Sequence, residues 1–198
     1  MPFLFKRLVL FLSITAAFAA DKEPAVFRPD AAPRYPHHQT NDKVTIAADP
    51  FVSGEKVQSA FGKLNPYEYG ILPVLVVIQN DGDKSVRLDR IQAVYTGPQG
   101  DKVEATPAGE VRYLRGPNRP KMIPGPAGKV KINKNKNPLT AWEIEGRAFA
   151  AKMLPAGQTA SGFFYFQTGL QRGATLYLSG LADAASGQEL FYYEIPLE

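Results

Sequence analysis

Apolar and polar residues alternate with a period of two along much of the chain, a pattern typical of half-buried β-strands. The alternation recurs in short segments that cover residues 44–47, 86–95, 162–167, 175–179 and 190–195. Residues 71–79 differ, because they are apolar at nearly every position and rich in β-branched side chains. We therefore expect this segment to be a central strand that is buried on both faces.

Turn residues separate these segments into about seven or eight strands, which predicts an all-β sandwich. Asn80–Asp83 is expected to form a tight hairpin turn, because Asp-Gly tolerates the positive φ that such turns need. Gly97–Gly100 should end the next strand. A short strand over residues 103–106 is expected to pair back across that turn.

Residues 140–153 do not alternate, and we expect them to form one short helix. Thr140 and Glu143 have the spacing of a capping box. Trp142, Phe149 and Met153 would share one face of this helix. A strand over residues 148–154 is the competing interpretation.

The first nineteen residues carry the pattern of an export signal. Lys6 and Arg7 precede an apolar run over residues 8–18, and Ala17-Phe18-Ala19 has the small-x-small form that a signal peptidase accepts. The run is about half of the roughly 20 residues needed to span a bilayer. We therefore expect removal of residues 1–19, no transmembrane segment afterwards, and a periplasmic or secreted protein.

Residues 20–42 contain four prolines, several charges and no apolar periodicity. Such a composition predicts a flexible Pro-rich arm, followed by a single domain over residues 43–198. The chain has no cysteine, so this domain must fold on apolar packing without disulfides. Its formal net charge is +4, and part of that leaves with the signal, so no global attraction to nucleic acid or anionic membrane is expected.

The strand and turn residues resemble those of a known group of proteins. The aliphatic strand that runs into Asn80–Asp83, the turn over residues 154–158 and the strand beginning Gly162-Phe163 resemble exported bacterial immunoglobulin-like domains of unknown function. The resemblance covers roughly residues 43–198 and implies an immunoglobulin-like β-sandwich and export. It carries over no catalytic or ligand-binding residue, since the matching positions are turn and core residues.

Few residue patterns in the chain suggest catalysis or metal binding. The segment Asn80–Asp83 lacks the spacing of a calcium loop, and His37 and His38 are adjacent, so they point opposite ways on an extended chain. We expect no cofactor, no metal and no catalytic residue. A glycan hydrolase with a carboxylate pair is the alternative, with candidates Glu143, Glu145, Asp183 and Glu189.

Residues 115–138 contain five prolines and three glycines, which predicts a long loop, and long ordered loops in compact domains are often functional. Basic residues gather here without an acid between them: Arg115, Arg119, Lys121, Lys129, Lys131, Lys134 and Lys136. Export and the lack of interleaved aromatics argue against nucleic acid. We expect an envelope protein or anionic polymer as partner, and the alternative is a solvated loop.

Aromatic residues gather in two of the expected strands, Phe163–Phe166 and Phe191–Tyr193. At a period of two, half of each run should face the core. Besides core and surface packing, these residues suggest a binding face built from Tyr165, Tyr177 and Tyr192.

Together these features predict an exported, non-catalytic binding or structural module of the bacterial envelope. One alternative is a subunit of a surface assembly, in which the arm of residues 20–42 pairs with a neighbouring sandwich. The glycan hydrolase is the other.

Overall fold

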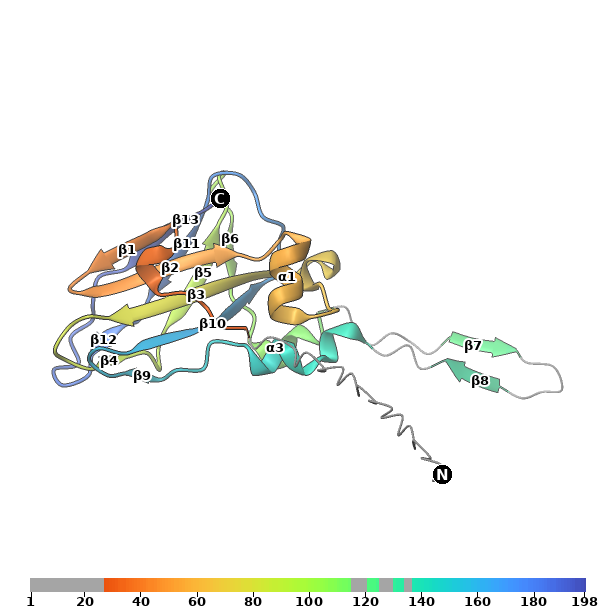
Figure 1. Ribbon diagram of the computed structural model, residues 1–198. Coiled ribbons are helices and arrows are strands. Elements are labelled where there is room, and N and C mark those ends of the chain that lie inside the picture. The colour runs from red at the N-terminus through yellow and green to blue at the C-terminus, as the bar shows by residue number, and fades with distance from the viewer. Residues whose placement is uncertain (1–26, 115–120, 125–129, 134–136) are drawn as a thin grey trace, which may run out of the picture.

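The computed structural model of the protein describes residues 27–114, 121–124, 130–133 and 137–198 (Figure 1). Most of its regular structure is strand, and all pairs of neighbouring strands are antiparallel. The expected all-β class is therefore confirmed. The described residues form thirteen strands, more than the sequence pattern predicted.

The first sheet has the strand order β1-β2-β3-β10. Its strands are β1 (His38–Asn41), β2 (Val44–Pro50), β3 (Leu72–Asn80) and β10 (Thr159–Phe166). β3 lies between two partners, and Gln79 is its only residue that is not fully buried. The prediction of a central strand over residues 71–79 is confirmed.

The second sheet has the strand order β13-β11-β5-β6. Its strands are β5 (Gln92–Thr96), β6 (Lys102–Glu104), β11 (Ala174–Ser179) and β13 (Tyr193–Leu197). β6 pairs back on β5 across Gly97–Gly100, as predicted, and Gly100 has a φ of +84° in this turn.

The first hydrophobic core lies between these two sheets. Alternate residues of the facing strands fill it, and they include Ile46, Val74, Val76, Ile78, Tyr95, Leu176, Leu178, Tyr193 and Ile195. Tyr177 lies between two of these core residues on β11 and is only half-buried. The predicted alternation of residues 175–179 is therefore confirmed.

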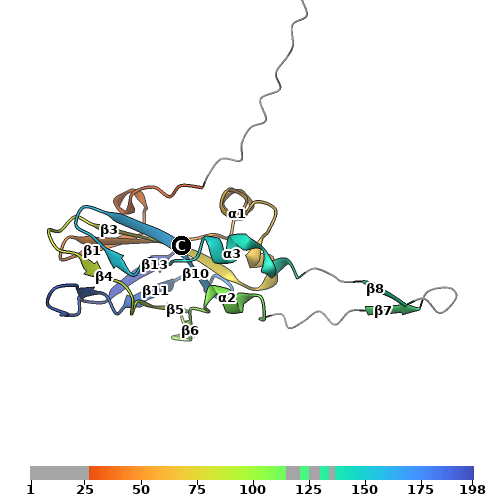
Figure 2. The ribbon, with the colours of Figure 1, turned by 90° about the horizontal axis from the view of Figure 1, so that it is seen from below.

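A second core covers the outer face of the first sheet. Ala47, Leu75, Val77, Phe163 and Tyr165 project from this face. They pack against three short α-helices and the 3-10 turns near them: α1 (Gly54–Phe61), α2 (Ala108–Val111), α3 (Trp142–Gly146), η1 (Ala32–Arg34), η2 (Pro66–Tyr69) and η4 (Pro138–Thr140). Figures 1 and 2 show the three α-helices gathered at one end of the sheets. Because β3 lies between two cores, it is apolar on both faces. The prediction of a single helix is wrong, since the described residues form three α-helices.

A small third sheet closes the opposite end of the molecule. It consists of β12 (Ala182–Asp183), β4 (Val86–Arg87) and β9 (Met153–Leu154), in that order. The predicted hairpin at Asn80–Asp83 is wrong, because β3 pairs with β2 and β10, whereas β4 pairs with β12 and β9. Gly82 does not take a positive φ, and the segment is a corner between sheets.

The predicted helix over residues 140–153 is also wrong in extent. Helix α3 spans only Trp142–Gly146. Its N-cap residue is Ala141, and no side chain forms a capping hydrogen bond there. The hydroxyl of Thr140 instead donates to the carbonyl of Asn137 at 2.7 Å. The strand alternative is correct in part, because Ala148 bridges to Phe163 and the chain then enters β9.

The predicted flexible arm is corrected for its described part. β1 pairs with β2 from His38 to Asn41, and Ala32 in η1 is fully buried. The ring of Phe27 lies 5.7 Å from the ring of Phe51. These contacts outweigh the proline-rich composition, and residues 27–42 pack as part of the domain. The expected export signal over residues 1–19 lies outside the described residues.

Candidate functional site

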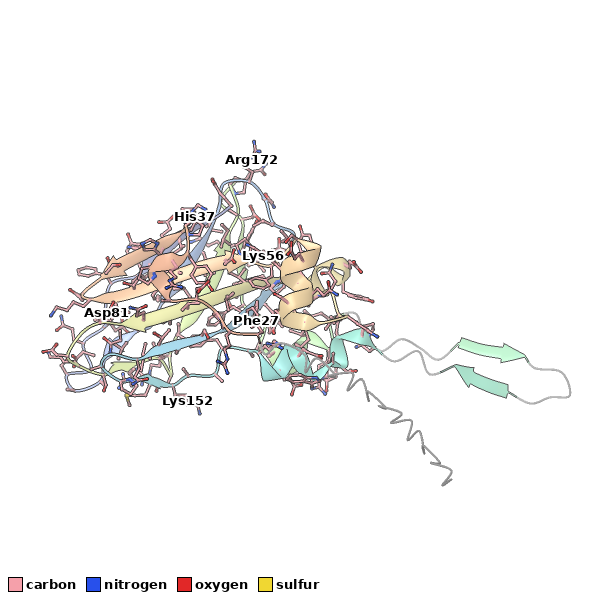
Figure 3. The ribbon with its side chains drawn as sticks, in the orientation of Figure 1. Phe27, His37, Lys56, Asp81, Lys152 and Arg172 are labelled. Atoms are coloured by element: carbon pink, nitrogen blue, oxygen red, sulfur yellow. The ribbon has the colours of Figure 1, made fainter. Side chains whose placement is uncertain are left out.

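A charged cleft of about 490 Å³ lies at the end of the molecule closed by the third sheet. Figure 3 labels Asp81, which follows β3 at this end. The side chains that line the cleft carry both signs of charge, together with amide, hydroxyl and aromatic groups: Asp42, Lys43, Asn80, Asp83, Lys84, Ser85, Asp183, Ser186, Gln188, Glu189 and Phe191. Such a lining offers donors and acceptors within one concave surface, as ligand sites do.

The two-residue turn between β1 and β2 forms one wall of this cleft. Asp42 and Lys43 have φ values of +47° and +63°, which a type I′ turn requires of both central residues. Non-glycine residues rarely adopt this conformation, and it costs roughly 1–2 kcal/mol per residue. The amide of Asp81 donates to the carbonyl of Lys43 at 2.8 Å and holds the turn against the end of β3. Backbone strain is therefore concentrated at the cleft.

Asp183 holds the opposite wall in place. Its Oδ1 accepts hydrogen bonds from the amide of Ser186 at 2.7 Å, the hydroxyl of Ser186 at 2.9 Å and the amide of Ala185 at 3.0 Å. Its Oδ2 lies 3.5 Å from the ammonium of Lys84. The bonds from Ser186 contribute most to lowering the pKa of Asp183 to about 2, and Lys84 adds to them. Oδ1 of this carboxylate is therefore occupied by hydrogen bonds from its neighbours, and its low pKa makes it a poor general acid at neutral pH.

The four candidate hydrolase carboxylates fall into two groups. Asp183 and Glu189 line the same cleft, and Glu189 is exposed. Glu143 and Glu145 lie on α3, at the end of the sheets where the three α-helices gather, which we call the helical end (Figure 2). Glu145 forms an ion pair there with Arg112. Only the first pair shares a concave surface, and one of its members is already bound by its neighbours.

An exposed aromatic ring lines the cleft, and a second exposed aromatic residue follows it in the chain. Phe191 is 74% exposed and lines the cleft, and Tyr192 is 52% exposed. The ring of Tyr192 stacks on that of Tyr177, with centroids 5.1 Å apart and an interplanar angle of 29°. We call this combination of the charged cleft with Phe191, Tyr192 and Tyr177 the aromatic cleft.

The suggested binding face of Tyr165, Tyr177 and Tyr192 is therefore corrected at one position. Tyr165 is buried in the second core, and its hydroxyl donates to the carbonyl of Ile144 at 2.7 Å. Burial raises the pKa of this phenol. The sequence pattern placed Phe191 with the core residue Tyr193, but β13 begins only at Tyr193 and leaves Phe191 exposed.

The predicted basic loop contains a hairpin of β7 (Lys121–Pro124) and β8 (Val130–Asn133). In its register Lys121 lies opposite Asn133 and Ile123 opposite Lys131. Figures 1 and 2 show this hairpin at the helical end, away from β12 and the aromatic cleft. The other five candidate contacts lie outside the described residues: Arg115, Arg119, Lys129, Lys134 and Lys136.

His37 and His38 lie where the chain enters β1, and the ring Nδ1 of His38 is 2.8 Å from the carbonyl of Tyr35. Within the described ranges, no group of three or more His, Cys, Asp or Glu side chains is arranged to hold a metal ion. None of the helices in that same part of the chain is long and apolar enough to cross a membrane.

No protein-family model matches the chain, and neither does any curated protein. Among solved structures, the chain is similar to the yjhA protein from Bacillus subtilis, with 13% identity, 83% of this chain and 98% of that chain covered, and a TM-score of 0.40. It is also similar to a functionally unknown protein from Listeria monocytogenes EGD-e, with 14% identity, 81% and 80% coverage, and a TM-score of 0.35.

Proposed function

We propose that this protein is an exported, non-catalytic binding module of the bacterial envelope that holds a glycan-bearing polymer at the aromatic cleft. The observation that carries the proposal is the exposed ring of Phe191 on a concave, mixed-charge surface, followed in the chain by the exposed Tyr192. Exposed aromatic rings in contact with polar groups are typical of binding surfaces.

The chemistry of the aromatic cleft suits sugars. A sugar ring presents C–H groups on its faces, and the negative face of an aromatic ring attracts them. Its hydroxyls both donate and accept, so they need acceptors such as Asp42 and Glu189 together with donors such as Lys43. A nucleic acid fits less well, because most charged side chains in this lining are acidic.

The strand order supports an immunoglobulin-like sandwich as the scaffold. An immunoglobulin sandwich places its first, second, fifth and fourth strands in one sheet, and its third, sixth and seventh in the other. The order β2-β3-β10 corresponds to the first, second and fifth strands, and β13-β11-β5 corresponds to the second sheet. Among the described residues no strand takes the place of the fourth beside β10, whereas β1 and β6 are added edge strands. The loops at the end of such a sandwich are common binding sites, and the aromatic cleft lies at one such end.

Two further features support the remaining parts of the proposal. The export pattern of residues 1–19 indicates that the partner lies outside the cytoplasm. The hydrogen bonds and low pKa of Asp183 make it a poor acid partner for Glu189, the other carboxylate candidate in the cleft.

Co-sedimentation with insoluble cell-wall glycan tests this proposal. The wild-type protein should pellet with the polymer, and the double variant Phe191→Ala, Tyr192→Ala should stay in solution with an unchanged melting temperature. Tyr113→Ala is the matched control, because Tyr113 is 69% exposed and follows α2 at the helical end. Equal pelleting of the wild type and the double variant would refute the role of the aromatic cleft.

A further inference from the structure

A small hollow opens on the outer face of the first sheet, apart from the aromatic cleft. Its volume is about 170 Å³, and the residues around it include Phe27, Leu75, Ser161 and Gly162. Arg147 is the only charged residue in the lining. Figure 3 labels Phe27 beside the helical end of the sheet, where this hollow lies.

Two aromatic rings hold the guanidinium of Arg147. Its Cζ lies 5.3 Å from the centre of the Phe27 ring and 5.8 Å from that of the Trp142 ring. Both contacts are within the range of cation–π attraction. The side chain is thus held by rings, which satisfy none of its N–H donors.

Gly146 allows this arrangement. A Cβ atom at position 146 would lie 2.7 Å from Cε3 of Trp142, closer than such contacts allow. The indole ring therefore lies against the glycine, and a side chain at position 146 would push the ring out of this position beside Arg147. The same glycine lines the hollow.

Arg147 is partly buried, and one nitrogen of its guanidinium lacks a hydrogen-bond partner among the described residues. Nε of Arg147 is buried and has no hydrogen-bond acceptor. The five ion pairs among the described residues do not include Arg147. Buried polar atoms are almost always paired, so an unpaired nitrogen of a charged group beside a hollow is a reason to look for an acceptor there.

We propose that Arg147 binds the carboxylate group of an acidic ligand in this hollow. A carboxylate matches the planar fork of a guanidinium with two parallel hydrogen bonds, and its single negative charge balances the single cation. This site goes beyond the proposed function, since it shares no lining residue with the aromatic cleft. The carboxylate can come from a uronic acid or from a glutamate-like group.

Trp142 provides the measurement, because it is the only tryptophan in the chain. We expect sodium glucuronate and N-acetylglutamate amide to give a saturable change in tryptophan fluorescence, and the tighter of the two identifies the source of the carboxylate. Glucose and N-acetylglutamine amide, at matched ionic strength, should give none. Arg147→Gln should weaken binding at least about tenfold, since it removes the charged partner.

Two variants complete the test. Arg147→Lys keeps the charge but loses the bidentate geometry, so its affinity should lie between those of the wild type and Arg147→Gln. Arg172→Gln is the matched control, because Arg172 lies on an exposed loop away from Phe27 (Figure 3), and it should bind like the wild type.

Calorimetric titration of the folded Arg147→Lys protein keeps the test valid if Arg147→Gln unfolds. A wild type without a saturable response to either acid, a response to inorganic phosphate alone, or undiminished binding by the Arg147 variants would overturn the proposal.

Discussion

The side-chain amide of Asn80 donates to the carbonyl of Leu154 at 3.2 Å, across 74 positions of sequence. The same Nδ2 lies 2.8 Å from the carbonyl of Lys84 and 3.1 Å from that of Pro155. Its Oδ1 accepts the amide of Gly82 at 3.0 Å. Asn80 is 1% exposed, so one buried amide joins the end of β3 to the start of the third sheet and to the wall of the aromatic cleft.

Replacing Asn80 should therefore destabilise the protein. Asn80→Ala leaves buried carbonyls without a donor, and we expect a loss of about 2 to 3 kcal/mol in the free energy of unfolding. Asn80→Asp should cost more, because a carboxylate would face carbonyl oxygens. Urea denaturation measures both, with the exposed Asp83→Asn as control. An Asn80→Ala protein within about 0.5 kcal/mol of the wild type would contradict this role.

Gly162→Ala should also destabilise the fold. A Cβ at this position would lie 2.4 Å from Cα of Phe149, a backbone atom that cannot move aside alone. We expect a loss of about 1–3 kcal/mol, as for other overpacked sites. Gly109→Ala is the matched control, because nothing lies within 4 Å of its Cβ and α2 favours alanine. Similar melting temperatures for the two variants would show that the backbone at Phe149 can move away from position 162 at little cost.

The alternating pattern could predict the strands because side-chain period depends only on the local chain. Residues 175–179 alternate between buried and half-buried positions as predicted, and residues 71–79, which are apolar at nearly every position, are buried on both faces. The pattern could not predict how strands pair. Asp-Gly after β3 has the composition of a hairpin, but the bonds of Asn80 to Leu154 and Pro155 place it at a corner between sheets.

Tertiary contacts also determine the structure of the N-terminal segment and of the aromatic cleft, which the local sequence pattern could not predict. Residues 27–42 are rich in proline, yet Phe27 and Ala32 find partners in the second core that no local pattern reveals. Phe191 follows the alternation of Tyr193 in sequence, but the strand begins two residues later. Glycine disfavours helix interiors, and at position 146 the structure uses it where a Cβ would clash with the indole of Trp142.

Removal of the N-terminal segment tests its docking. A chain that begins at Lys43 loses β1, the buried Ala32 and the contacts of Phe27 with Phe51 and Phe163. We expect its melting temperature to fall by about 10 °C or more relative to a chain that begins at Phe27, since each kcal/mol shifts the midpoint by about 2–4 °C at this size. A shift of only a few degrees would indicate that the segment contributes little.

The ion pair and hydrogen bonds of Asp183 predict a pH dependence. The pKa of this carboxyl is lowered from 3.8 to about 2, so its stabilising effect is present above pH 3.8 and is lost as the pH falls through about 2. Asp183→Asn keeps the oxygen acceptor but removes the charge. Its urea midpoint should lie below that of the wild type at pH 6, and the two should converge near pH 2. A constant difference across this range would mean that the charge has no part in stability.

The central claim is that the aromatic cleft binds a glycan, and backbone NMR during titration with soluble cell-wall glycan fragments tests it most directly. We predict saturable shifts at Phe191, Tyr192 and Tyr177, together with the cleft residues Asp42 and Lys43. Residues of the helical end, such as Tyr113, should not shift. Saturable shifts confined to β7 and β8, or no shifts at Phe191 and Tyr192 at any concentration, would contradict the account.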